Sequence, residues 1–474
     1  MEKKARGGFT GNIGFVLAAA GSAVGLGNLW RFPYLAAKDG GGLFILLYII
    51  LSLTAGFALM TAEISIGRKT GVSPLMAYTQ LDRRFGFLGY LSTIVPVIIF
   101  PYYCVIGGWV TKYATAYTFG GVDKLYETGT GSYFTGFITD TWAPLIFFFI
   151  FMALTAVVIV LGVEKGIEKV SKVMMPALVL LILGIAIYSL TLSHTDADGV
   201  KRTAMQGLKI YLIPSFEGMT VPKFFGILLD AFGQMFYSLS IAMGILITYG
   251  SYCKKDSNLI KSVNQIQLFD TGIALLAGLI VIPSVFVFQG KEGLATSGPS
   301  LMFVSLPSIF EQMGVVGTIV GILFFVLVLF AALTSSISLM ETVASSIMDR
   351  FHFSRPKATA ITFVFSLIVG VIVCLGYNVF YLEMSLPNGA KGQQILDLLD
   401  YIANSILLPV VALVTCILVG WCYKPKGIIE EVQIGLDGKK FYREKLFVAV
   451  IKYAAPVLLV IIMLQAFNVF SFLG

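Results

Sequence analysis

The chain has 474 residues, of which 57% are hydrophobic and only 12% are charged, and its mean hydropathy is +0.88. A soluble domain carries roughly 25% charged residues, so a soluble enzyme is excluded. The net charge of +7 does not indicate nucleic-acid binding, because Lys and Arg gather in short segments between apolar runs and form no single basic face. These numbers predict an integral membrane protein.

Apolar runs of about 20 residues, the length that crosses a bilayer, recur along the whole chain. Charged, Gly and Pro clusters divide them into eleven predicted membrane spans, which start near residues 13, 43, 87, 142, 172, 225, 260, 313, 357, 396 and 446. The expected fold class is therefore an all-α polytopic membrane protein, with one transmembrane domain over residues 1–474.

The orientation follows from the distribution of Lys and Arg. Every second segment between spans is basic, beginning with Lys3, Lys4 and Arg6, and cytoplasmic loops carry such an excess. We expect a multi-pass protein of the cell membrane with a cytoplasmic N-terminus, and eleven spans then place Gly474 outside. The N-terminus has no cleavage pattern of a signal peptide, so the first span is retained.

Two predicted spans are interrupted by small residues. Span 1 contains GSAVGLGN from Gly21, and span 6 contains SLSIAMG from Ser238. Each run alone also fits close helix packing. However, spans 1 and 6 begin two five-span halves, about residues 10–192 and 225–422, with an eleventh helix near 446–472. Interrupted helices at matched positions indicate the binding site of a secondary transporter built from inverted repeats.

These residues resemble one known family. The run GSAVGLGNLWRFP from Gly21 is similar to the first helix of the neurotransmitter:sodium symporter family, and further motifs follow in order. They are KDGGG from Lys38, Glu63 with Gly67-Arg68, Tyr102-Tyr103, GVEKGIEKVSKVMMP from Gly162, GQMFYSLSIAMG from Gly233, LTSSISLME from Leu333 and LDLLDY from Leu396. The bacterial amino-acid members are closest in kind.

The resemblance implies a fold and a function. The fold is the LeuT-type 5+5 inverted repeat with helices 1 and 6 broken, plus one additional helix. The function is sodium-coupled import of a neutral hydrophobic L-amino acid, aliphatic or aromatic, by alternating access. The implied partners are the amino acid, sodium ions and the lipid bilayer, and no organic cofactor or nucleic acid is expected.

Two sodium sites are implied in the same way. The first comprises Ala23, Asn28, Ser238 and Asp270, completed by the substrate carboxylate. The second comprises Gly21, Val24, Ala331, Thr334 and Ser335. A small hard cation needs several oxygen ligands, and broken helices expose carbonyls that regular helices consume. Taken alone, the hydroxyls of Thr334 and Ser335 also fit bonding back to the preceding helical turn.

The implied substrate site combines polar ends with an apolar wall. It comprises Leu26, Gly27, Ile99, Tyr103, Tyr237, Ser238, Ser240, Met243, Ser335 and Leu339. A zwitterion fits between half-helix ends of opposite polarity. Gly25 occupies a position where monoamine-transporting relatives carry aspartate, which favours an amino acid with its own carboxylate.

The resemblance also implies a gate on each side of the substrate site. Arg31 and Asp400 resemble the outer ion pair, with Tyr103 and Tyr237 as a lid, while Arg6 and Asp349 resemble the inner pair beside Phe9, where tryptophan is usual. Any one of these charges alone also fits an interfacial, snorkelling side chain.

Asp270 departs from well-known relatives, which carry asparagine at that position. Animal relatives bind chloride nearby through groups like Tyr48, Gln234 and Ser238, and through a serine where this chain has Ala274. Our hypothesis is that the fixed carboxylate of Asp270 makes chloride unnecessary, because two anions repel each other at low dielectric.

Two other classes of function are considered. An intramembrane enzyme is disfavoured because His194 and His352 lie outside span interiors and no HExxH, GxSxG or Walker-type motif is present. A non-transporting amino-acid sensor or scaffold of the same fold stays open. The preferred amino acid, the sodium stoichiometry and the oligomeric state also stay open.

Overall fold

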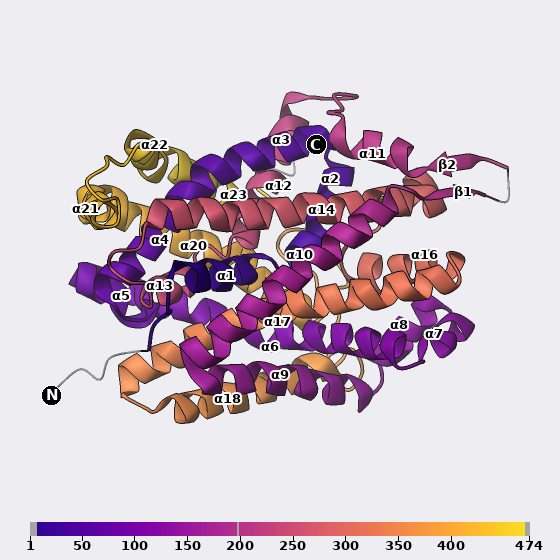
Figure 1. Ribbon diagram of the computed structural model, residues 1–474, viewed down its shortest axis with the longest axis horizontal. Helices are drawn as coiled ribbons and strands as arrows, with labels where there is room; N and C mark the ends of the chain where they lie inside the picture. The colour runs from indigo at the N-terminus through magenta and orange to yellow at the C-terminus, as the bar shows by residue number, and fades with distance from the viewer. Residues whose placement is uncertain (1–6, 197–198, 470–474) are drawn as a thin grey trace.

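The computed structural model describes residues 7–196 and 199–469. Most of its helices run along the longest axis of the molecule (Figure 1). The helices of the first half are α1 (Asn12–Ala23), α2 (Phe32–Lys38), α3 (Gly42–Leu51), α4 (Phe57–Thr70), α5 (Pro74–Leu81), α6 (Gly86–Thr118), α7 (Val122–Thr128), α8 (Thr130–Ile138), α9 (Ala143–Gly162) and α10 (Lys169–Ser189).

The rest of the chain continues the bundle. Its helices are α11 (Ala204–Leu212), α12 (Val221–Ser238), α13 (Ile245–Gly250), α14 (Leu259–Gly293), α15 (Gly298–Ser300), α16 (Leu306–Gln312), α17 (Val315–Phe351), α18 (Arg355–Leu375), α19 (Ile395–Asp400), α20 (Leu408–Ile417), α21 (Lys426–Ile434), α22 (Glu444–Ala449) and α23 (Ala455–Ala466). Short π-helical turns join several neighbours, including α3 to α4 through Ser52–Gly56 and α19 to α20 through Tyr401–Leu407.

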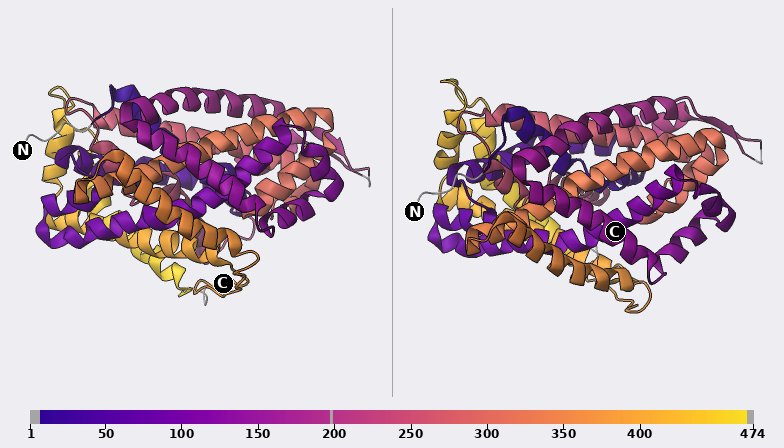
Figure 2. Two further views of the ribbon diagram at one scale, coloured as in Figure 1. Left: turned by 90° about the horizontal axis from the view of Figure 1, so that it is seen from below. Right: turned by 60° about the horizontal axis from the view of Figure 1, so that its bottom comes forward.

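A small hairpin is the exception to the all-helical architecture. Strands β1 (Ser193–Thr195) and β2 (Lys201–Thr203) pair antiparallel, with His194 opposite Arg202. The hairpin projects from the end of the molecule opposite to α21 and α22 (Figure 2). It lies within the long segment after the fifth predicted span.

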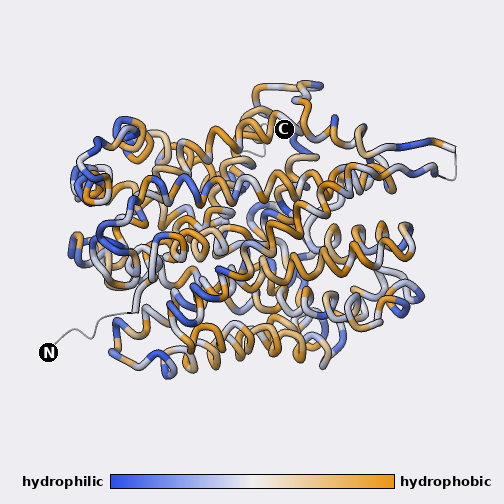
Figure 3. The backbone as a smooth tube through the Cα atoms, viewed as in Figure 1, coloured by the Kyte–Doolittle hydropathy of each residue, from blue (hydrophilic) through white to orange (hydrophobic). Residues whose placement is uncertain are grey.

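The outer surface of the helices has the apolar character of a membrane protein. Hydrophobic residues dominate the body of the bundle (Figure 3). On α10, the side chains of Val173, Leu180 and Ile187 are 67%, 71% and 67% exposed. Contiguous exposed apolar surface of this kind is matched to lipid. The prediction of an all-α polytopic membrane protein is thus confirmed, apart from the hairpin.

The count of eleven spans is not confirmed. Within the described residues, eight helical segments are long and apolar enough to cross a membrane, and a bent pair, Asn12–Ala23 with Gly27–Lys38, makes up to nine. One of the eight is the 47-residue segment Ala143–Ser189. It contains two predicted spans and is interrupted at Gly162, whose φ is +88°. The predicted sixth span is divided between α12 and α13. Eleven spans therefore stay a prediction.

Both predicted helix breaks are present. Helix α1 ends at Ala23, Val24 is extended, and the axis bends by 53° before the chain continues. Between α12 and α13, Ser240, Ala242 and Gly244 have φ values of 54°, 64° and 72°. This left-handed conformation costs a residue with a side chain about 1–2 kcal/mol, so tertiary contacts must hold it.

Glu63 supplies one such contact. The backbone N–H of Ala242 donates to Oε1 of Glu63 at 2.7 Å, and the Glu63 side chain, on α4, is buried. A backbone group freed at membrane depth needs a partner from neighbouring protein. The carboxylate of Glu63 therefore braces the break between α12 and α13.

Candidate functional site

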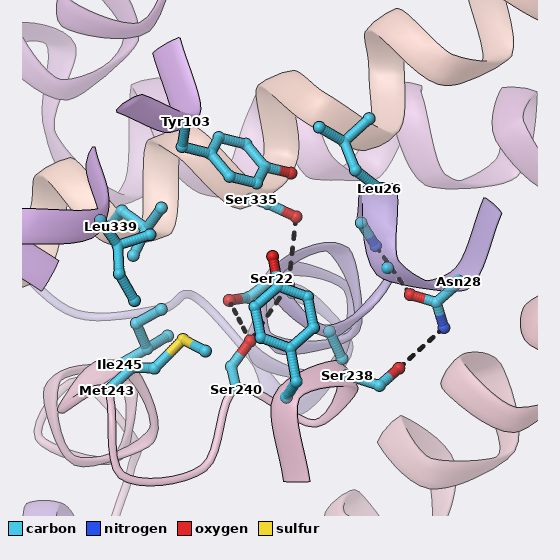
Figure 4. Close-up of a pocket in the computed structure, with 15 residues that line it drawn as sticks. Ser22, Leu26, Asn28, Tyr103, Ser238, Ser240, Met243, Ile245, Ser335 and Leu339 are labelled. Atoms are coloured by element: carbon cyan, nitrogen blue, oxygen red, sulfur yellow. Dashed lines mark hydrogen bonds between the residues drawn. The ribbon is translucent and has the colours of Figure 1, made fainter. Parts of the chain in front are cut away.

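A buried cavity of about 30 Å³ lies where the two helix breaks meet α6 and α17 (Figure 4). All ten residues predicted for the substrate site line it. The complete lining is Ser22, Ala23, Gly25, Leu26, Gly27, Asn28, Ile99, Tyr103, Tyr237, Ser238, Ser240, Met243, Ile245, Ser335 and Leu339. The fold thus brings together residues more than 300 positions apart in the chain.

Three of these lining residues belong to no predicted site: Gly25, noted only as a position where relatives carry aspartate, and Ser22 and Ile245, which were not considered. Ser22 lies in the same GSAVGLGN run as the predicted residues, and Ile245 directly follows Met243-Gly244. Their neighbours in the sequence were the available signal. The side chain of Ser240 lies 3.2 Å from both the hydroxyl and the carbonyl oxygen of Ser22. This contact ties one helix break to the other.

The hydroxyl of Tyr103 has no hydrogen-bond partner within the described chain, although the residue is buried. Tyr103 comes from α6 and lines the cavity next to Leu26 (Figure 4). An unpaired buried polar group costs about 1–3 kcal/mol, and such exceptions need an explanation. A ligand that accepts a hydrogen bond would satisfy this donor.

Two glycines keep the cavity open, because a side chain at either position would fill the space beside it. A Cβ atom added to Gly25 would lie 2.8 Å from Oγ of Ser335 and 3.3 Å from the Tyr103 hydroxyl. A Cβ atom added to Gly27 would lie 2.7 Å from the ring of Tyr237. A side chain at either position would displace these neighbours, so the backbone itself faces the cavity.

The first predicted ion cluster surrounds the carboxylate of Asp270. Asn28 Nδ2 and the Ser238 hydroxyl donate to its Oδ1 at 2.7 Å and 2.5 Å, and the Tyr48 hydroxyl donates to its Oδ2 at 2.8 Å. The Asp270 side chain on α14 is fully buried. Ala23, the fourth predicted member, lines the cavity beside Asn28 and Ser238. A buried carboxylate is thus held between the breaks and α14 by three neutral donors.

The second predicted cluster joins α17 to the break after α1. The hydroxyl of Ser335 lies 3.1 Å from the carbonyl oxygen of Ser22 and 3.4 Å from those of Gly21 and Val24. The hydroxyl of Thr334 lies 3.1 Å from the carbonyl oxygen of Ala331.

The alternative interpretation, that these hydroxyls bond back to the preceding turn of their own helix, holds for Thr334 but not for Ser335. Thr334 bonds back to its own helix, at Ala331 and Phe330, as membrane-helix hydroxyls commonly do. Ser335 instead bonds across to the α1 break. Ser335 thus gathers the carbonyl oxygens of Gly21 and Val24 around its hydroxyl, whereas Thr334 and Ala331 pair with each other on α17. Carbonyl and hydroxyl oxygens are the ligands that a hard cation requires.

A larger cavity of about 610 Å³ adjoins the first on the side of α19. Leu26, Tyr103 and Tyr237 line both cavities and therefore lie where the two meet. The predicted gate residues Arg31 and Asp400 both line the larger cavity.

Arg31 and Asp400 make no ion pair within 4 Å in the part of the chain that the structure describes. The guanidinium of Arg31 lies 5.8 Å from the ring centroid of Tyr237. Asp400 accepts hydrogen bonds from Tyr102 at 3.0 Å and from Asn404 at 2.6 Å. Tyr102 and Asn404 were not predicted as its partners. Both charges line the larger cavity, where Asp400 is held by these two donors and Arg31 lies against the Tyr237 ring.

The opposite side of the site is closed by aromatic rings. Phe9 is 3% exposed, and its ring packs against Phe15, Tyr249 and Tyr252 with centroid distances of 5.8, 5.7 and 6.2 Å. The carboxylate of Asp349 accepts a hydrogen bond from the backbone N–H of Ser73 at 2.6 Å. Arg6, its predicted partner, lies outside the described residues.

Comparison with known proteins decides the family. The profile described as "Sodium:neurotransmitter symporter family" matches residues 6–121 and 138–473. The chain belongs to the sodium:neurotransmitter symporter family. It is 33% identical to an uncharacterized sodium-dependent transporter of Bacillus subtilis (strain 168), over 97% of each chain. It is 26% identical to the human sodium- and chloride-dependent GABA transporter 2, over 91% of this chain and 77% of that one.

A solved structure agrees in fold with this symporter. The crystal structure of MhsT in complex with L-phenylalanine matches with a TM-score of 0.85 and 34% identity, over 98% of this chain and 100% of that chain. These comparisons confirm the predicted family and fold class. The protein is a multi-pass membrane transporter of a sodium-dependent symporter family, and the prediction that it is not an enzyme is confirmed with it.

Proposed function

We propose that this symporter imports a neutral hydrophobic L-amino acid together with sodium, by alternating access and without chloride. One observation carries the proposal: a single buried cavity combines the unpaired Tyr103 hydroxyl, exposed backbone and an apolar wall. Its lining includes Asn28 and Ser238 of the first oxygen cluster and Ser335 of the second. A zwitterion with an apolar side chain has the complementary chemistry.

The polar end of the substrate is assigned to the helix breaks. The carboxylate accepts from the Tyr103 hydroxyl and faces the backbone of Leu26 and Gly27, while helix ends of opposite polarity suit the two charges of the zwitterion. The lack of space beside Gly25 argues against the aspartate-based recognition of a bare amine. The substrate therefore brings its own carboxylate to the site.

The apolar end of the substrate is assigned to the wall of Ile99, Met243, Ile245 and Leu339. None of these side chains offers a hydrogen bond to a substrate side chain, so a hydrophobic side chain is favoured. Met243 has a flexible, polarizable side chain that adapts to differently shaped ligands. The complex of the similar transporter MhsT with L-phenylalanine supports the same substrate class.

Sodium is a co-transported substrate in this proposal, with one ion at each oxygen cluster. An ion that crosses about 100 mV gains about 2.3 kcal/mol, and a tenfold sodium gradient adds about 1.4 kcal/mol. One ion would sustain an amino-acid gradient of roughly 500-fold, and two on the order of 10⁵-fold at full coupling. Because the substrate is neutral overall, transport moves net positive charge inward.

Chloride independence is assigned to Asp270. Three donors converge on its carboxylate beside the first cluster. A fixed negative charge there balances the sodium ion and repels a second anion. Asn28, Ser238 and Tyr48 already donate to this carboxylate, so these groups do not need chloride as a hydrogen-bond acceptor.

Alternating access is assigned to the two sides of the site. The larger cavity opens on one side, while the Phe9 cluster closes the other. Closure of the open side would bring Arg31 toward Asp400, and opening of the inner side would separate Phe9 from Tyr249 and Tyr252. The basic segments between spans support a cytoplasmic N-terminus and an extracytoplasmic C-terminus.

Uptake by the purified protein in proteoliposomes tests the proposal. We expect accumulation of labelled leucine or phenylalanine that requires an inward sodium gradient, and counterflow of label into vesicles preloaded with the unlabelled amino acid. If the uptake of every hydrophobic amino acid is independent of sodium, the proposal is overturned. Binding without counterflow would indicate a sensor.

A further inference from the structure

A third cavity is lined by residues at the start of α14 and in the loop 435–443 that joins α21 to α22. Helices α21 and α22 lie at the same end of the molecule (Figure 1). The cavity has a volume of about 370 Å³, within the usual range for ligand sites. The lining is Asn258, Ile260, Lys261, Asn264, Gln265, Leu268, Leu436, Lys439, Lys440 and Tyr442. Three lysines and no carboxylate line it, among the residues that the structure describes.

Tertiary contacts hold both sides of this cavity in place. A Cβ atom added to Gly435 would lie 2.1 Å from the carbonyl oxygen of Ser257, so the loop backbone is pressed against the segment before α14. Farther along the loop, Asn264 donates to the hydroxyl of Tyr442 at 3.2 Å. The loop thus contacts the segment before α14 on one side of its lysines and α14 itself on the other.

The cavity concentrates groups that bind anions. Lys261, Lys439 and Lys440 are exposed and have no carboxylate within 4 Å in the described ranges. The first turn of α14, a helix of 35 residues, also faces the cavity and adds the partial positive charge of a helix N-terminus. Ammonium groups and helix N-termini are both common phosphate ligands.

The chemistry of the wall changes along α14. Seven residues beyond Lys261, at a rise of about 10 Å, Leu268 lines the same cavity with its side chain 74% exposed. This part of α14 belongs to the apolar membrane span Leu259–Gly293. Tyr442, which is 67% exposed, lines the same cavity. Tyrosines are enriched at membrane interfaces. A free phosphate would use only the cationic part of this wall, whereas a phospholipid would use both parts.

We propose that this cavity binds the headgroup of an anionic phospholipid, with an acyl chain lying along Leu268. Basic pockets between membrane helices bind such headgroups on the cytoplasmic side, the side predicted for this basic end of the protein. The lipid phosphate contacts Lys261, Lys439 and Lys440. Because α14 also carries Asp270, the lipid stabilises the helix that holds the first ion cluster.

A thermal-shift titration of the delipidated full-length protein in detergent tests this site. The probes are dioctanoyl phosphatidylglycerol, dioctanoyl phosphatidylcholine, glycerol 3-phosphate and inorganic phosphate. A ligand that binds only the folded state raises the apparent stability. We expect the anionic lipid to raise the Tm at a concentration at least fivefold lower than any other probe. Equal effects of glycerol 3-phosphate or phosphate would show an anion site and overturn the lipid assignment.

Two sets of variants separate the site from general electrostatics. The triple variant Lys261→Gln, Lys439→Gln and Lys440→Gln should need at least fivefold more lipid for the same shift. The control Lys201→Gln, Lys291→Gln and Lys391→Gln removes the same charge from exposed positions elsewhere and should behave as the unmodified protein. An equal loss in both sets would overturn the proposal.

A single variant tests the acyl contact. Leu268→Gln should weaken the effect of the lipid and leave that of inorganic phosphate unchanged, because only the lipid uses the apolar wall. An unchanged response to the lipid in Leu268→Gln would contradict the placement of the acyl chain. Arginine at all three lysine positions should preserve lipid binding if the charges carry it.

Discussion

The amide nitrogen of Asn28 donates to the carboxylate of Asp270 at 2.7 Å, across 242 positions of the chain. This bond joins the break after α1 to the middle of α14 and places a full negative charge beside the proposed first sodium site. Ser238 donates to the same carboxylate oxygen at 2.5 Å. Removal of this negative charge therefore tests whether Asp270 balances the positive charge of the sodium ion.

The variant Asp270→Asn should raise the sodium concentration for half-maximal uptake at least tenfold, a cost of about 1.4 kcal/mol. It should also make uptake respond to chloride, because the fixed anion is gone. The unmodified protein should transport equally in chloride and gluconate, measured in proteoliposomes at matched sodium. Asp256→Asn, an exposed carboxylate, is the control. Loss of wild-type uptake in gluconate would contradict the role of Asp270.

The variant Tyr103→Phe should lower substrate affinity by roughly 10-fold to 100-fold, because a hydrogen bond to a charged group contributes about 1.5–3 kcal/mol. The Tm without substrate should not fall, since the hydroxyl has no partner in the described chain. Equilibrium binding of labelled amino acid and a thermal melt measure the two effects. In the control Tyr249→Phe, which breaks a 2.7 Å bond to Ser338, the Tm should fall while affinity changes little.

The variant Gly25→Ala should weaken amino-acid binding at least tenfold, because the added methyl group would lie 2.8 Å from Oγ of Ser335. Ser335 also belongs to the proposed second sodium site, so the sodium dependence of binding should weaken in parallel. Scintillation proximity binding across sodium concentrations measures both. Gly184→Ala has no atom within 4 Å of the new methyl group and should bind normally. Normal affinity in Gly25→Ala would refute the assignment.

Stability should depend on pH through Asp39, which lies between the first two spans. Burial, and then the negative charge of Asp230, raise the pKa of Asp39 to about 7, while Lys38 opposes them. A raised carboxyl pKa means that the folded state holds the proton more tightly than the unfolded state does. The resulting stabilisation is complete below about pH 4 and is lost as the pH rises toward 7.

The variant Asp39→Asn should therefore melt about 2 °C or more above the unmodified protein at pH 8 and at the same temperature near pH 4. Asp82→Asn is the control of opposite sign, because a hydrogen bond from Arg84 lowers the pKa of Asp82. That variant should show no gain at pH 8. A difference for Asp39→Asn that is independent of pH would exclude titration of this carboxyl as the cause.

The sequence by itself determined the membrane class, the helical fold and the two helix breaks. These are local properties, because burial in lipid demands long apolar runs and because glycine runs weaken a helix wherever it packs. The family motifs extended this to the cavity, and all ten residues predicted for the substrate site line it. Ser22 and Ile245 escaped prediction although their neighbours in the chain were named.

Only the tertiary structure decided which polar groups meet. Tyr48 bonds to Asp270 on a helix more than 200 positions away. Asp400 bonds to Tyr102 and Asn404, while Arg31 lines the same cavity and lies against the ring of Tyr237. Such contacts depend on the relative placement and rotation of whole helices, which the apolar pattern of one helix does not encode. The space beside Gly25 has the same origin, because Ser335 and Tyr103 reach it from α17 and α6.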